Sequence, residues 1–144
     1  MHATVRSVIE AAGDGSAEVC VLDTEASPEH LTRGTARYAD TMLVVVEPWF
    51  KSLETGRRIA ALAKDLGIER VALVANKIRD DADRAAVREL AGREGLELAG
   101  VVPYDEALTG AERVRKAPLD FAPDAAAIAA IGELAQRLSG DGRA

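Results

Sequence analysis

The feature that most constrains the fold of this sequence is a repeated alternation between short apolar runs and longer segments of helical period. The clearest apolar run is Met42 to Val46, which is rich in β-branched residues and too short to cross a membrane. Amphipathic segments separate the apolar runs, and this spacing is typical of strands joined by crossover helices. We therefore predict an α/β domain with a mostly parallel sheet of about four strands and with helices on both faces.

Capping and turn residues give bounds to these elements. Ser27 followed by Pro28 is typical of a helix start, and Gly67 and Gly95 are typical of helix ends. The predicted strands are Ala17 to Leu22, Thr41 to Val46 as a central strand, Arg70 to Ala75, and Glu97 to Val102. The predicted helices cover residues 3–12, 29–38 and 52–66, a segment from a cap at Asp80 or Asp81 to Arg93, and residues 106–115 and 124–138, with residues 117–123 separating the last two.

The length and composition indicate one globular unit. With 144 residues and 48% hydrophobic content, the chain has enough apolar side chains for one core and too few residues for two domains. We expect a single α/β domain over residues 1–139 and a flexible tail over residues 140–144. The net charge of −6 is spread along the sequence, so no surface for nucleic acid or anionic membranes is expected, and no apolar stretch is long enough for a transmembrane segment.

The single cysteine, Cys20, limits redox and metal chemistry. One cysteine cannot form an internal disulfide or a cysteine-only metal cluster within one chain. Because Cys20 lies in an apolar run, we interpret it as a core residue and expect a reducing, cytoplasmic setting. His30 has no histidine or cysteine close to it in the sequence, so we do not interpret it as a metal ligand.

Three loops at the predicted carboxyl ends of strands are the places to seek chemistry, because ligands of open α/β sheets bind there. The loops begin at Asp23, at Ala75-Asn76-Lys77, and at Val102-Pro103. An aspartate that follows a buried strand can hold magnesium-bound water, since its carboxylate is a hard oxygen ligand on a rigid base. The alternative is that Asp23 only caps a helix or closes a turn.

Taken together, these loops carry a resemblance to a known family. The segments involved read D-T-E-A-S-P-E-H-L-T-R-G-T-A-R-Y-A-D-T-M-L-V-V-V-E-P from Asp23, S-L-E-T-G-R-R-I-A-A-L from Ser52, D-L-G-I at 65–68, V-A-N-K at 74–77 and V-P-Y-D-E at 102–106. They resemble the CooC family, the nickel-insertion ATPases of carbon monoxide dehydrogenase, within the wider MinD and ParA group. The match covers most of residues 17–116 and corresponds to the carboxyl-terminal portion of an ATPase of this kind.

The resemblance implies that ATP and magnesium are the family's cofactors. It implies a phosphate-switch role for the first loop, where the candidates are Asp23, Glu25 and Ser27, with Asp23 in indirect contact with magnesium. Glu29 and His30 would then lie on the switch helix.

For the base, the resemblance implies that Asn76 reads the adenine edge and that Pro103, Tyr104 and Asp105 lie against the adenine ring. These residue types suit that role physically. An asparagine amide offers both a donor and an acceptor to adenine, and a proline-containing loop offers a stiff apolar wall.

Three departures from the family pattern limit what is inherited. The sequence contains no G-x-x-x-x-G-K-[ST] segment, and so no glycine-rich cradle of amides and no lysine for the phosphates. Phosphoryl transfer relies on positioning and charge stabilisation, so we expect this chain alone to be inactive as an ATPase. In addition, Ser27 and Pro28 stand where relatives place glycine in the switch loop, and the family's metal-binding cysteine pair is missing.

The missing loop also affects the expected fold. The family resemblance places the phosphate-loop strand between the Asp23 strand and the Thr41 strand of an incomplete P-loop NTPase fold of the SIMIBI type. Its loss leaves a gap or makes those two strands pair directly through a right-handed crossover.

Two functional hypotheses follow. In the first, the chain is part of a nickel-insertion ATPase that works with a phosphate-loop-bearing half or as a homodimer, and that serves a client like carbon monoxide dehydrogenase. In the second, it is a stand-alone pseudo-ATPase module that docks a partner protein. Trp49 and Phe50 follow a strand end, where they form a docking surface or pack over the sheet edge. A flavodoxin-like or receiver-like domain explains the Asn76 and Pro103 loops less well.

Overall fold

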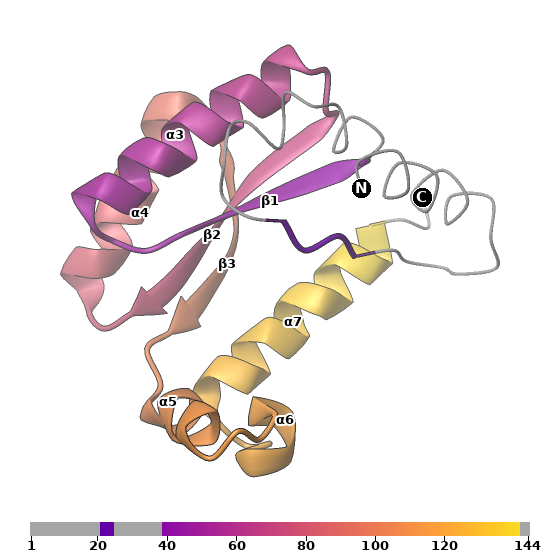
Figure 1. The fold of residues 1–144 in the computed structure, drawn as a ribbon. Coiled ribbons are helices and arrows are strands. Elements are labelled where there is room, and N and C mark those ends of the chain that lie inside the picture. The colour runs from indigo at the N-terminus through magenta and orange to yellow at the C-terminus, as the bar shows by residue number, and fades with distance from the viewer. Residues whose placement is uncertain (1–20, 25–38, 142–144) are drawn as a thin grey trace, which may run out of the picture.

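The computed structural model describes residues 21–24 and 39–141 (Figure 1). The elements in chain order are β1 (Thr41–Val46), α3 (Phe50–Asp65), β2 (Arg70–Ile78), α4 (Asp81–Glu94), β3 (Glu97–Pro103), α5 (Glu106–Arg113), α6 (Pro118–Phe121) and α7 (Ala126–Asp141). The helices predicted over residues 3–12 and 29–38 lie outside the described residues.

The described strands form a parallel sheet in the order β1, β2, β3. Parallel neighbours need a crossover connection, and α3 and α4 supply the two crossovers. Leu73 of β2 pairs with Val44 on one side and with Leu98 on the other. Among the described strands β2 therefore pairs on both sides and β1 pairs with β2 alone, and the central place of the Thr41 strand in the whole sheet stays a prediction.

Helices cover both faces of the sheet, as predicted (Figure 1). The first hydrophobic cluster packs α3 and α4 on one face and comprises Val44, Val46, Ile59, Ala60, Ala63, Ile68, Leu73, Ala75, Ile78, Val87, Leu90, Ala91 and Leu96. The second packs α7 on the other face and comprises Ala72, Val74, Ala99, Val102, Ala127 and Leu134. Because successive strand residues point to opposite faces, the apolar run of β2 supplies both clusters.

The ends of α4 follow the rules of helix capping. Asp80 accepts a hydrogen bond at its side chain from the Asp83 amide at 2.8 Å, which satisfies one of the free amides of the first turn. Gly95 closes the helix with a φ of 59°, in the left-handed region that glycine adopts without steric cost. Of the two caps that the sequence allowed, Asp80 is the one used.

Helix α3 begins at Phe50, two residues earlier than predicted. Its N-cap residue, Trp49, makes no side-chain capping bond. Ser52, which the sequence suggested as the start, lies inside the first turn and accepts a hydrogen bond at Oγ from the Glu47 amide at 3.0 Å. Further along the helix, Gly56 is buried directly against Val46 of β1, so a close helix-to-strand approach depends on the missing side chain.

Two predicted strand ends are corrected by the structure. The strands β2 and β3 extend to Ile78 and Pro103, so Asn76, Lys77 and Pro103 belong to strands and not to loops. Backbone pairing between β2 and β3 continues beyond the apolar run of β2, up to Ile78 and Pro103, and the polar side chains there do not prevent this pairing.

The first predicted strand, Ala17 to Leu22, is described at its last two residues. Residues 17–20 lie outside the described part of the chain, but Val21 and Leu22 are described, have no strand structure, and are exposed.

The carboxyl-terminal helices differ from the prediction as well. Helix α5 ends at Arg113, and the segment predicted to separate the last two helices contains the short helix α6, which begins with proline at its first position. Helix α7 continues to Asp141, into the predicted flexible tail. Within residues 21–24 and 39–141, no helix is both long and apolar enough to span a membrane.

Candidate functional site

The carboxyl ends of the three strands meet at one edge of the sheet, at the lower left of Figure 1. Ile78 at the end of β2 pairs with Pro103 at the end of β3, and the Tyr104 amide donates to the Ile78 carbonyl at 2.9 Å. The edge collects a group of polar and aromatic side chains that we call the strand-end cluster, defined as Glu47, Trp49, Asn76, Lys77, Arg79 and Tyr104.

A β-bulge at the end of β2 turns Asn76 and Lys77 out of the regular ladder. Ala75 and Ile78, three residues apart, pair with residues only two apart on β3. Lys77 has a φ of 56°, and left-handed backbone costs a non-glycine residue about 1–2 kcal/mol. Bulges of this kind re-aim side chains and are common beside functional sites.

The bulge sets the hydrogen bonding of Asn76. Its Oδ1 accepts from the Lys77 amide at 3.0 Å. Within the described part of the chain nothing accepts a hydrogen bond from Asn76 Nδ2. This half-buried amide therefore presents a donor that a ligand can use.

Glu47, directly after β1, joins the segment that follows β1 to the bulge of β2. Its Oε1 accepts from Lys77 Nζ at 2.6 Å, and its Oε2 accepts from Trp49 Nε1 at 3.0 Å. The hydrogen bond from Lys77 is the main cause that holds the pKa of Glu47 below its ordinary value of 4.5, and Trp49 and the charge of Arg79 act in the same direction. Glu47 is therefore a carboxylate at neutral pH, with both oxygens engaged.

Arg79 links the segments that follow all three strands. Its guanidinium carbon lies 5.2 Å from the centroid of the Trp49 ring and 4.6 Å from that of Tyr104. Each cation–π contact at such exposed positions contributes about 0.5–1 kcal/mol. Trp49 thus contacts both Arg79 and Glu47.

Asp105 caps two helices at once. Its Oδ1 accepts from the Ala107 amide of α5 at 2.9 Å, and its Oδ2 accepts from the Ala127 amide of α7 at 3.3 Å. Both oxygens of the carboxylate are therefore engaged in holding helix starts. The residue that the resemblance placed against adenine has a structural role in this geometry.

Replacing Asp105 with alanine is expected to lower the free energy of unfolding by about 1–2 kcal/mol, because two helices lose a capping acceptor. Asp120→Ala is the matched control, since Asp120 is exposed in α6 and its side chain accepts no hydrogen bond among the described residues. Urea unfolding followed by circular dichroism measures both. Equal stability of the two variants would contradict the double cap.

The structure brings together four of the residues singled out from the sequence: Asn76, Pro103, Tyr104 and Asp105. Asp23 is exposed in the short described segment 21–24, while Glu25, Ser27, Glu29 and His30 lie outside the described residues.

Sequence reasoning missed Glu47, Lys77 and Arg79 as members of the cluster. Their partners lie far along the chain, as in the ion pair between Glu47 and Lys77, thirty residues apart. The available signals are Glu47, which directly follows the apolar run of β1, and Lys77, which follows that of β2 after one residue, Asn76.

The ends of β2 and β3 carry polar and aromatic groups of the kind that contact a purine base. Asn76 offers an amide donor, and Pro103 and Tyr104 offer an apolar and aromatic wall. Phosphates need a cradle of backbone amides with a lysine, and the 144-residue sequence has no such motif. Residues 21–24 and 39–141 contain no group of three metal-binding side chains, and Asp23 stands alone there as a candidate for magnesium.

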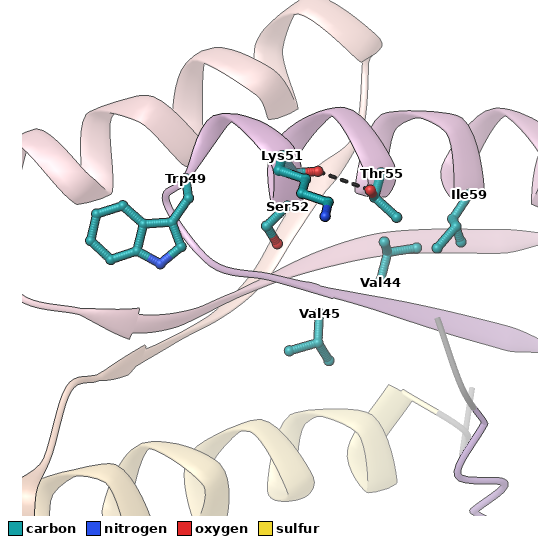
Figure 2. A pocket seen from close by; sticks show the side chains of 8 residues that line it. Val44, Val45, Trp49, Lys51, Ser52, Thr55 and Ile59 are labelled. Carbon is teal, nitrogen blue, oxygen red and sulfur yellow. Dashed lines mark hydrogen bonds between the residues drawn. The ribbon is translucent and has the colours of Figure 1, made fainter. Parts of the chain in front are cut away.

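A shallow hollow lies beside the cluster, between β1 and the start of α3 (Figure 2). Its volume is about 320 Å³, and its lining is mostly apolar. Figure 2 shows Val44 pointing toward α3 and Val45 pointing to the opposite face of the sheet. Val45 is 58% exposed and Phe50 is 85% exposed, so this end of the described sheet carries uncovered apolar surface.

Comparison with known proteins gives the cluster a context. No family model matches the sequence. The chain is 43% identical over 100 residues to an uncharacterized ATP-binding protein of Methanocaldococcus jannaschii, and that match covers 69% of this chain and 38% of the relative. It is 33% identical over 122 residues to the carbon monoxide dehydrogenase accessory protein CooC of Rhodospirillum rubrum, and that match covers 85% of this chain and 46% of the relative. The chain thus spans less than half the length of these relatives.

Solved structures agree with this at the level of the fold. The MinD cell division protein of Aquifex aeolicus superposes with a TM-score of 0.79 at 20% identity, over 97% of this chain and 61% of that one. The MinC:MinD complex of the same organism gives a TM-score of 0.78 at 21% identity, over 95% of this chain and 57% of that one. The chain therefore belongs to the CooC and MinD-like group of P-loop ATPases, of which it represents a carboxyl-terminal portion.

Proposed function

We propose that this chain supplies the base-binding part of a CooC-like ATP-binding protein related to nickel insertion into a client like carbon monoxide dehydrogenase, and that it does not hydrolyse ATP by itself. The similarity to CooC supports the client and the process. ATP with magnesium would be the cofactor, and a reducing cytoplasm would be the setting.

The observation that carries this proposal is that the strand-end cluster has groups suited to a base and no set of groups suited to phosphates. It offers an amide donor on Asn76 that no described residue uses and a partly exposed aromatic ring on Tyr104, which also contacts Arg79, and such groups suit a purine base. A lysine is present in the cluster, but Lys77 Nζ is paired with Glu47 and is not held by a glycine-rich loop. Base binding without phosphate binding is what such a cluster would support.

The edge of β1 suggests where a phosphate-loop-bearing half would attach. Among the described strands β1 pairs on one side only, and apolar surface is exposed beside it. Parallel sheets are normally buried on both faces and continue into further strands. A strand from another part of the protein, or from a second copy, would complete the sheet there.

The proposal is tested by comparing adenosine with magnesium ATP on the purified chain. Because the phosphates would find no partners, we expect both ligands to bind with similar dissociation constants of roughly 1 mM. We also expect no phosphate release. Chemical-shift titration by NMR measures binding, and Asn76→Ala should weaken binding of both ligands. Glu54→Gln is the control, since among the described residues Glu54 pairs with Arg57 and Arg58 of its own helix.

Each other outcome has a distinct meaning. Much tighter binding of ATP than of adenosine, or any phosphate release, would show that the chain holds phosphates. Absence of binding by either ligand would contradict the base site.

A second candidate function is a pseudo-ATPase module that docks a partner protein. The exposed Phe50 and the shallow hollow lined by Val44, Trp49 and Ile59 favour it. It predicts a chain that is stably folded alone and ignores both ligands in the titration described above.

A further inference from the structure

Glu47 occupies a central position in the strand-end cluster that base binding alone does not explain. Its two carboxylate oxygens take hydrogen bonds from different segments, at 2.6 Å from Lys77 and at 3.0 Å from Trp49. Its backbone amide is fixed by Ser52 Oγ at 3.0 Å. Glu47 is thus anchored on α3 and reaches across to β2.

The contact between Glu47 and Lys77 lies just beyond the point where backbone pairing between β1 and β2 ends. Val46 and Ala75 form the last residue pair between β1 and β2, and Glu47 and Asn76 follow them in the chain. Beyond that pair, two side-chain contacts connect these regions among the described residues: the Glu47–Lys77 ion pair, and the contact of Arg79 with the Trp49 ring. The ion pair holds the bulge from the side opposite to β3.

The bulge needs such a contact because its backbone is strained. Lys77 adopts the left-handed region, which lysine enters only when surrounding contacts fix it there. In the described part of the chain Glu47 is the partner of the Lys77 side chain. The amide of this same strained residue donates to Asn76 Oδ1 at 3.0 Å. The position of the Lys77 backbone therefore determines how the Asn76 amide is turned.

Because this ion pair is partly exposed, it can position nearby residues while contributing little to the stability of the fold. The side chains of Lys77 and Glu47 are 52% and 32% exposed, and pairs at such positions contribute little to folding. The pair is nevertheless short and lies at a strained bulge. Its effect should therefore be local, on the geometry of the bulge.

We infer that Glu47 is a positioning residue for the base site, which acts through Lys77 to orient the Asn76 amide toward the ligand. The inference rests on the proposed function for the identity of the ligand, an adenine base. It assigns Glu47 a role through other residues, without direct contact with the base. Trp49, bonded to the same carboxylate, reports on that arrangement.

The test uses the full 144-residue chain and the variants Glu47→Gln and Lys77→Met. We expect both variants to move the NMR signals of the Asn76 side-chain amide and of the Lys77 backbone amide, and to leave the signals of α4 and α7 in place. Adenosine should bind roughly twofold to fivefold more weakly to each variant, as the loss of one partly exposed ion pair implies. The double variant should be no weaker than either single one, because both remove the same contact.

The controls separate a local effect from a general one. Lys77→Arg keeps the charge and should restore most of the affinity. Glu54→Gln removes the same charge from an ion pair within α3, so it should leave the Asn76 signals and the affinity unchanged. Glu47→Gln should also shift the fluorescence of Trp49, the single tryptophan of the sequence.

The outcomes distinguish this inference from the proposed function. If the unaltered chain binds no adenosine, the base site fails, while the Asn76 and Lys77 signals still decide whether Glu47 orients the bulge. Asn76 signals that stay in place in Glu47→Gln would overturn the inference. Additive losses in the double variant would overturn it as well, since Glu47 and Lys77 would then act separately.

Discussion

Replacing Leu73 with alanine is expected to lower the free energy of unfolding by about 2–5 kcal/mol, the range for truncating a fully buried leucine. Leu73 is completely buried in the middle of β2 and belongs to the cluster under α3 and α4. Its backbone pairs with both neighbouring strands, so the surrounding structure cannot close easily over the lost volume. For a domain whose whole stability is about 5–15 kcal/mol, the change is severe.

Urea unfolding followed by circular dichroism measures this change. Leu119→Ala is the matched control, because Leu119 in α6 is 63% exposed and its truncation should change the stability by less than about 0.5 kcal/mol. A loss below about 1 kcal/mol for Leu73→Ala would mean that the site collapses freely and that β2 is not the rigid centre of the sheet.

Replacing Gly56 with alanine is expected to destabilise the chain by about 1–2 kcal/mol, although alanine is the better helix former by about 1 kcal/mol. A methyl group at this position would overlap Cγ1 of Val46, a fully buried residue of β1, and would approach Cγ1 of Val44 at 3.6 Å. Steric overlap in a closed core therefore outweighs the gain in helix propensity. Either α3 moves away from β1 or Val46 leaves its preferred rotamer.

Two further variants check this explanation by thermal or urea unfolding. Gly92 lies in α4 with nothing near its missing side chain, so Gly92→Ala should stabilise the chain by up to about 1 kcal/mol. Adding Val46→Ala to Gly56→Ala should reduce the penalty of the glycine change, because it removes the overlapping methyl groups. A stabilising effect of Gly56→Ala alone would contradict the close approach.

The fold was predictable where apolar periodicity and capping agree. The strand β1 has the predicted bounds because its apolar run is uninterrupted, and α4 ends at the predicted Gly95. The start of α3 was not predictable, because Trp49 is a poor cap and Ser52 bonds to Glu47. The local sequence indicated Ser52 as the start of the helix, but the Ser52 hydroxyl accepts a hydrogen bond from the amide of Glu47, five residues earlier.

The end of β2 shows why the site was predictable only in part. Asn76 and Lys77 are polar and follow an apolar run, a pattern that predicts a loop, but they form a bulge within a strand. A left-handed lysine has no signature in the sequence, because no glycine marks it. The partners that explain it, such as Glu47, come from another strand and become visible only when the sheet is assembled.

Asp105 illustrates a different limit. An aspartate before Glu106 and Ala107 is a recognisable N-cap for α5, and the observed bond to Ala107 follows that rule. Its second bond, to Ala127, joins residues 22 positions apart and could not be inferred from local pattern. A residue assigned to the ligand by resemblance can therefore also be required by the fold.

The same carboxylate has a consequence for how this region can change. The segment from Glu106 to Ala126 contains α5 and α6. The Asp105 side chain accepts hydrogen bonds at both ends of this segment, so it closes the segment into a loop. Helix α7 is held by that closure and by its packing on the sheet, and not by the length of the path before it. Leu108 of α5 packs against the same cluster as α7, whereas residues 112–121 are exposed, so we expect changes of length to be tolerated in that exposed stretch and not in α5.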